Sequence, residues 1–83
     1  MRQIYTQYVY QFDNYFEAHR YFLEEVRYLK TMYPANEKMT VDEKENWYIV
    51  MSPSKCILIA NVIKHNNTVK IMFDKEEYER NLK

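Results

Sequence analysis

Residues 14–34, NYFEAHRYFLEEVRYLKTMYP, decide the predicted fold, because they contain the signals of one long amphipathic helix. Asn14 can cap the start of this helix, with Glu17 three residues later as its capping-box partner. Pro34 ends the helix near Tyr33, because a residue before proline avoids the helical region. Apolar side chains at three- and four-residue spacing predict one buried stripe: Tyr15, His19, Phe22, Val26, Leu29 and Tyr33, widened by Phe16 and Leu23.

The segments on either side of this helix predict β-strands. Residues 2–12 alternate, with Ile4, Tyr8, Tyr10 and Phe12 on one face, which is typical of a strand with one buried side. After the helix, three further strands are predicted at roughly 47–52, 55–64 and 68–73. Their turns are Ser52-Pro53-Ser54 and Asn66-Asn67, and asparagine tolerates the left-handed backbone that a tight turn needs.

The middle strand, residues 55–64, is apolar on both faces. This pattern predicts a central strand that is covered on both sides. One helix covers one face. We expect the second face to meet the C-terminal segment, the connection at 34–46, or another chain.

Residues 34–46 predict a long polar connection, and connections of this length are usually functional or mobile. They carry an acidic cluster of Asp42, Glu43 and Glu45. A short edge strand at residues 39–41 is the alternative. Near the C-terminus, Asp74 is a helix cap with Glu77 at the capping-box position, followed by a short helix.

The sequence therefore predicts a single α+β domain over residues 1–83. Its order is β-α-β-β-β, with the long helix packed on an antiparallel sheet and a short C-terminal helix.

Composition and charge limit the compartment and the partners. The chain is 47% hydrophobic, too much for a disordered segment, and its one cysteine, Cys56, forms no internal disulfide. The longest apolar stretch, residues 56–63, is far short of the roughly 20 residues of a membrane span, and the N-terminus lacks a signal-peptide core. Residues with AT-rich codons are abundant. We therefore expect a cytoplasmic protein of a bacterial host, encoded by a low-GC bacterium, its phage or a mobile element, that does not bind membranes.

Nucleic acid is not expected as a partner. Lysine and arginine together number 12, as do aspartate and glutamate, so the net charge is zero. Proteins that bind nucleic acids usually gain affinity by neutralising phosphates with a basic excess.

Few residues suggest chemistry. His19 lies in the apolar stripe and His65 beside a turn, so each is expected to be structural rather than catalytic. Cys56 opens a buried strand, where a thiol is inert. Without glycine, a phosphate-binding glycine loop is excluded, and one cysteine with two distant histidines gives no zinc spacing. We expect a protein that is not an enzyme and that has no cofactor and no metal.

Nine tyrosines are the most unusual feature. Tyr21 and Tyr28 lie seven residues apart beside the predicted stripe, with Met32 on the same strip, and such residues are enriched at protein interfaces. The predicted partner-binding residues are Tyr21, Glu25, Tyr28 and Met32, together with Asp42, Glu43 and Glu45. The hypothesis is a small protein-binding inhibitor that acts on host machinery, of the anti-defence type, with an unidentified protein partner or a homodimer.

Two alternatives involve RNA. From residue 14 onward, the order of elements resembles a double-stranded-RNA-binding domain, but Asp74-Lys75-Glu76-Glu77 stands where that family has a lysine cluster. The order of strand, helix and three strands is similar to that of mRNA-cleaving toxins from toxin–antitoxin pairs. That resemblance implies an RNase using tyrosine, arginine and His65, although this chain lacks the basic character of that family.

Overall fold

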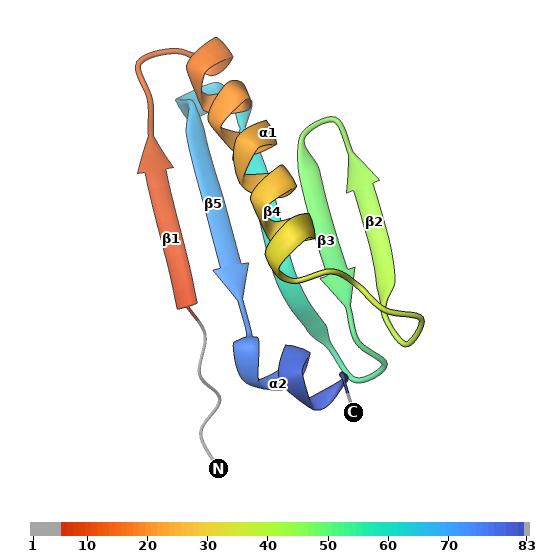
Figure 1. The fold of residues 1–83 in the computed structure, drawn as a ribbon. Helices are drawn as coiled ribbons and strands as arrows, with labels where there is room; N and C mark the ends of the chain where they lie inside the picture. Colours follow the sequence, from red (N-terminus) through yellow and green to blue (C-terminus); the bar gives the residue numbers. More distant parts are fainter. Residues whose placement is uncertain (1–5, 83) are drawn as a thin grey trace.

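The elements follow one another along the chain with short connections. The computed structural model describes residues 6–82. Its elements are β1 (Thr6–Gln11), α1 (Tyr15–Met32), β2 (Thr40–Lys44), β3 (Trp47–Met51), β4 (Cys56–Ile63), the 3₁₀ turn η1 (Lys64–Asn66), β5 (Thr68–Phe73) and α2 (Lys75–Arg80). Over these residues the strands form one five-stranded antiparallel sheet in the order β1-β5-β4-β3-β2 (Figure 1). The predicted α+β fold, with a long helix on an antiparallel sheet and a short C-terminal helix, is confirmed.

The strand boundaries agree closely with the predicted ones. The boundaries of β3, β4 and β5 lie within one residue of the predicted ones. β1 confirms the strand over residues 6–11, while residues 2–5 of the predicted strand lie outside the described part of the chain. Asn67 has a φ angle of 52° and a ψ angle of 44°, the left-handed conformation expected of an asparagine in this turn.

Local signals at its two ends define α1. The Asn14 side chain accepts a hydrogen bond from the Glu17 backbone N–H at 2.9 Å, as the predicted cap requires. At the other end, the Tyr33 N–H donates to the Leu29 carbonyl at 2.8 Å, and Pro34 follows.

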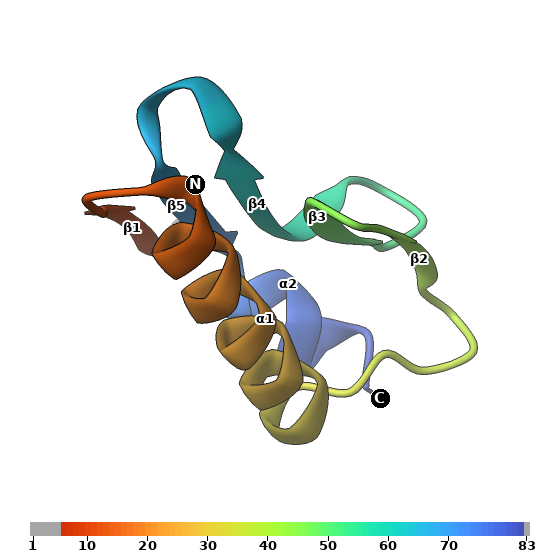
Figure 2. The ribbon, with the colours of Figure 1, turned by 90° about the horizontal axis from the view of Figure 1, so that it is seen from above.

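The core lies between α1 and one face of the sheet. Figures 1 and 2 show α1 crossing that face over β4 and β5. The helix buries Ala18, Phe22, Val26 and Leu29, and the strands bury Tyr48, Val50, Leu58, Ala60, Val62, Val69, Ile71 and Phe73. Burying each large apolar side chain stabilises the fold by about 1.5–3 kcal/mol, so this layer is the main source of stability.

One part of the predicted stripe is wrong. Phe16 is 72% exposed and Leu23 is 49% exposed, whereas Ala18 is completely buried. The buried face of α1 is therefore centred nearer to Ala18 than the sequence pattern suggested. A single helix over the centre of the sheet presents one narrow strip to it, and the flank with Phe16 and Leu23 faces solvent.

The prediction of residues 34–46 as an irregular connection is also wrong. Residues Thr40–Lys44 form β2, which pairs with β3 along its whole length. All five side chains of β2 are exposed, so its position in the sheet depends on backbone pairing rather than on an apolar face. The alternative of an edge strand at 39–41 is correct in placing a strand here, but β2 begins one residue later and ends three residues later.

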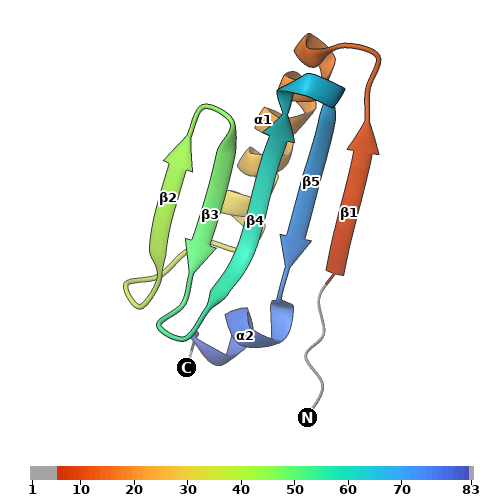
Figure 3. The same cartoon turned by 180° about the vertical axis from the view of Figure 1, so that it is seen from behind.

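The face of the sheet opposite α1 has no second layer within residues 6–82 (Figure 3). α2 lies at one end of the sheet, and β2 lies in the sheet itself, so neither predicted intramolecular cover is present. Ile59 and Met72 on this face are half-buried, because neighbouring side chains on the pleated surface shield each other. Of the three predicted covers for this face of β4, only another chain is not excluded by the arrangement of residues 6–82.

None of the helices in the described part of the chain is long and apolar enough to cross a membrane.

Candidate partner-binding groove

A groove of about 540 Å³ lies between α1 and the β1 side of the sheet. Its walls are mainly aromatic and are formed by Tyr8, Tyr10, Tyr28, Tyr33, Ile71 and Phe73. Two charged side chains, Glu25 and Lys75, also line it. We call this feature the tyrosine groove.

Sheet pairing explains the wall formed by β1. Tyr8 pairs with Ile71 and Tyr10 with Val69, so both tyrosines share the face that carries the core. Their rings stack with centroids 6.2 Å apart. Because β1 is the outermost strand, Tyr8 remains 49% exposed. It forms the outer rim of the groove.

The floor of the groove is an aromatic cluster fixed by α2. The Tyr33 ring lies 4.5 Å from the Phe73 ring and 5.5 Å from the Tyr78 ring, measured between centroids. Phe73 and Tyr78 are 5.8 Å apart, the contact of a hydrophobic staple at the start of α2. The Tyr78 hydroxyl donates to the Pro34 carbonyl at 3.2 Å. These contacts connect the end of α1, the end of β5 and α2, so the floor is preorganised.

The structure separates the predicted strip of Tyr21, Glu25, Tyr28 and Met32 into two parts. Tyr28 and Met32 are 53% and 52% exposed, and the half-buried Glu25 lines the groove beside Tyr28. Tyr21 instead packs inward, with its ring centroid 5.0 Å from that of Tyr10. This difference arises because β1 lies beside this flank of α1 and covers its N-terminal half.

Tyr21 also makes a polar contact within the molecule. Its hydroxyl donates to Glu25 Oε1 at 2.9 Å. Burial, followed by this hydrogen bond, raises the pKa of the Tyr21 phenol above its usual value, so the hydroxyl stays protonated. Tyr21 joins α1 to β1, and the exposed part of the predicted strip consists of Tyr28 and Met32.

The predicted acidic cluster does not form one site. Asp42 pairs with Ile49 and Glu43 with Tyr48, so these two side chains lie on opposite faces of the sheet. Glu43 Oε2 forms an ion pair with Lys30 Nζ at 2.7 Å. Glu45 lies beyond β2 in the turn toward β3. The strand order places this region at the edge of the sheet far from the tyrosine groove.

His19 packs among aromatic side chains of α1. Its ring lies between Tyr15 and Phe22, with centroids 5.5 Å and 6.0 Å away. Its Nε2 is 3.0 Å from the Glu45 carbonyl oxygen, which joins α1 to the turn between β2 and β3.

His65 and Cys56 lie in different environments. His65 is exposed in η1, as the turn position predicted. Cys56 is half-buried at the start of β4, and its Sγ contacts the Leu58 carbonyl at 3.8 Å. Burial raises the pKa of this thiol, which disfavours the reactive thiolate.

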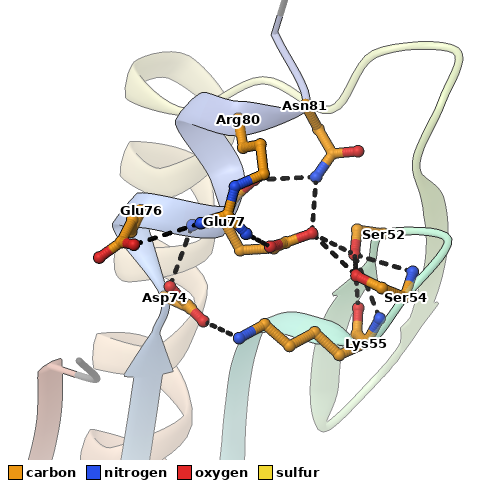
Figure 4. A network of polar contacts seen from close by, with 8 residues as sticks. All are labelled: Ser52, Ser54, Lys55, Asp74, Glu76, Glu77, Arg80 and Asn81. Carbon is orange, nitrogen blue, oxygen red and sulfur yellow. Dashed lines mark hydrogen bonds and ion pairs between the residues drawn. The ribbon is translucent and has the colours of Figure 1, made fainter. Parts of the chain in front are cut away.

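A polar network joins the β3–β4 turn to α2 (Figure 4). Asp74 Oδ1 accepts from the Glu77 N–H at 3.1 Å, which confirms the predicted cap. Asp74 Oδ2 lies 2.6 Å from Lys55 Nζ. Burial alone would raise the pKa of Asp74, but the hydrogen bonds from Lys55 and the Glu77 N–H outweigh it and lower the pKa.

The Glu77 side chain extends this network instead of closing a capping box. Ser54 and Ser52 donate to its Oε2 at 2.9 Å and 3.2 Å, Asn81 donates to the same oxygen at 3.0 Å, and Arg80 pairs with Oε1. Hydrogen bonding, first from Ser54, lowers the pKa of this carboxyl against the effect of burial. The network acts as a clamp that fixes α2 against the sheet. The sequence identified the caps, but the pairing with Ser52 and Ser54 required the tertiary structure.

Over residues 6–82, no three or more histidine, cysteine, aspartate or glutamate side chains are arranged to hold a metal ion. Comparison of the chain with protein-family models, with curated proteins and with solved structures finds no match.

Proposed function

We propose that this chain is a non-enzymatic protein-binding protein and that its partner occupies the tyrosine groove. The observation that carries the proposal is a ring of large side chains around a preorganised groove. Tyr8 and Tyr28, which line the groove, and Met32, one helical turn beyond Tyr28, are each about half exposed, and Phe73 is buried at its floor.

The chemistry of these side chains supports a protein as the partner. A tyrosine offers a large apolar area and a hydroxyl with little conformational entropy to lose, and methionine adapts its shape to a contacting surface. Truncating such an anchor commonly costs ~2 kcal/mol or more of binding free energy. The charged Glu25 and Lys75 would orient a partner by offering one group of each sign at the groove.

The composition supports a bacterial mobile element as the source of the chain. Residues with AT-rich codons are abundant, and a small, tyrosine-rich binding protein of this kind suits an inhibitor of host machinery in the cytoplasm, of the anti-defence type. The balanced charge favours a protein partner over RNA. An RNase-like toxin is therefore the less favoured alternative.

Two double variants of α1 test the proposal. Tyr28→Glu/Met32→Glu places charge in the groove at Tyr28 and one turn beyond it at Met32, whereas Phe16→Glu/Leu23→Glu places charge on exposed positions of α1 outside the groove. Glutamate is a good helix former, so both variants should keep α1. Tagged proteins would be incubated with a lysate of a low-GC bacterium, and the captured proteins identified by mass spectrometry.

We expect a protein captured by the wild type to be lost with the groove variant and retained with the control variant. Capture that survives in Tyr28→Glu/Met32→Glu but fails in Phe16→Glu/Leu23→Glu would place the site elsewhere and contradict the proposal. RNA cleavage by the purified chain would favour the alternative.

A further inference from the structure

The outer edge of β1 is free within residues 6–82 (Figures 1 and 3). β1 pairs with β5 on its inner side, and the Phe12 N–H, just beyond the strand, donates to the Asn67 carbonyl at 2.9 Å in the same direction. In an antiparallel ladder, alternate residues direct both backbone groups to the same side. Gln7, Val9 and Gln11 therefore direct their N–H and C=O groups outward.

The sequence of this edge reads the same in both directions. Residues 7–11 are Gln-Tyr-Val-Tyr-Gln, a palindrome centred on Val9. A strand that pairs antiparallel with a copy of itself places residue i opposite residue 18 − i when Val9 lies on the two-fold axis. Each side chain then meets one of its own type, so Gln7 lies opposite Gln11, and Tyr8 lies opposite Tyr10.

The two edges of the sheet differ in charge. β1 carries no charged residue, whereas β2 contains Asp42, Glu43 and Lys44 among its five residues. Pairing of β2 with its own copy about Asp42 would set two carboxylates opposite each other, which is unfavourable. Native proteins protect free edges with such charges, and β1 lacks this protection.

We propose that a second copy of this chain pairs with β1 through an antiparallel β1–β1 contact centred on Val9. The outward backbone groups of Gln7, Val9 and Gln11 are those that the ladder uses in this register, because the pair on the axis is a hydrogen-bonded one. Two five-stranded sheets then join into one continuous sheet. The two-fold axis is perpendicular to the sheet, so both α1 helices lie on the same face.

This interface goes beyond the proposed function, because it uses the edge of the sheet and needs no other protein. It places two tyrosine grooves side by side, with Tyr8 at the rim of each groove and next to the axis. The two proposals are tested independently. A partner that the groove variants do not release would contradict the groove as the binding site but not the dimer, and a protein that stays monomeric would contradict the dimer but not the groove.

Proline at position 9 tests the contact without disturbing the sheet of one copy. Val9→Pro removes an N–H that points outward, and proline is tolerated at such a position on an edge strand. Val9→Thr keeps the N–H and the β-branched shape. Sedimentation velocity over a range of concentrations would give the dimer dissociation constant, and circular dichroism would check the fold. We expect Val9→Pro to raise the dissociation constant about tenfold or more, through two lost backbone hydrogen bonds, and Val9→Thr to preserve dimerisation.

A pair of charge variants tests the register. In Gln7→Lys/Gln11→Lys the two new ammonium groups of neighbouring copies oppose each other, so this variant should be monomeric. In Gln7→Lys/Gln11→Glu each ammonium meets a carboxylate of the second copy, so dimerisation should be restored. A wild-type protein that stays monomeric up to its solubility limit would overturn the proposal. So would a dimer that is insensitive to Val9→Pro and to Gln7→Lys/Gln11→Lys, which would indicate a different interface.

Discussion

Replacing Asp74 separates two contributions of one side chain to stability. Asp74→Asn keeps an oxygen that can accept from the Glu77 N–H, whereas Asp74→Ala removes the cap and the ion pair with Lys55 together. Removing one partner of a buried ion pair costs about 3–5 kcal/mol, and losing a cap costs about 1 kcal/mol. The Asp74 side chain is 2% exposed, but that of Lys55 is 26% exposed. We therefore expect a loss near the lower limit, about 3 kcal/mol for Asp74→Asn and about 4 kcal/mol for Asp74→Ala.

These losses are large for a chain of 83 residues, for which the free energy of unfolding is about 4–12 kcal/mol. Urea unfolding followed by the fluorescence of Trp47, the one tryptophan, would measure them. The matched control is Glu76→Gln. The ion pair between Glu76 and Arg80 is about half exposed on both sides, so this change should cost less than about 1 kcal/mol.

The pH dependence provides a second test of the same interaction. The pKa of Asp74 is lowered in the folded protein, so its contribution is present above the ordinary aspartate pKa of about 3.9 and is lost as the pH falls through the lower, folded value. The difference between the wild type and Asp74→Asn should therefore shrink in acid. An Asp74→Asn protein as stable as the wild type at neutral pH would refute this reasoning, as would a deficit that persists unchanged at low pH.

Three further predictions concern the tyrosines and the RNA alternative. Tyr21→Ala should lower the free energy of unfolding by about 2 kcal/mol, roughly half the cost for a fully buried aromatic residue. Tyr28→Ala should change it by less than about 0.5 kcal/mol. Equal losses of the two variants in urea unfolding would contradict the positions assigned to these tyrosines. Because the pKa of Tyr21 is raised, its contribution should fall as the pH rises above about 10, and Tyr21→Phe should weaken this dependence. Purified protein should not cleave RNA in a gel assay, and cleavage that is lost in His65→Ala would instead establish the toxin alternative.

The sequence predicted those parts of the fold that depend on local signals. Asn14 and Pro34 delimit α1 because capping and proline sterics act within a few residues. Asn67 takes the left-handed conformation of its turn for the same reason. Asp74 caps α2 as predicted.

The parts of the fold and of the groove that the sequence did not predict depend on contacts between distant segments. β2 has no apolar alternation, because Asp42, Glu43 and Lys44 are all exposed, and its pairing with β3 is invisible to a pattern of hydrophobicity. The tyrosine groove was found only in part. The positions of Tyr28 and Met32 on one helical strip were predictable, but the contribution of β1 was not, because β1 pairs with β5 at the other end of the chain.

The affinity of the captured partner tests the central claim most directly. The purified partner would be titrated calorimetrically with the wild type, with Tyr28→Ala and with Leu23→Ala. Tyr28 and Leu23 are 53% and 49% exposed and lie on opposite flanks of α1. We predict that Tyr28→Ala raises the dissociation constant at least about tenfold, while Leu23→Ala changes it by less than about twofold. Unchanged affinity in Tyr28→Ala, or a loss confined to Leu23→Ala, would contradict the tyrosine groove as the partner-binding site.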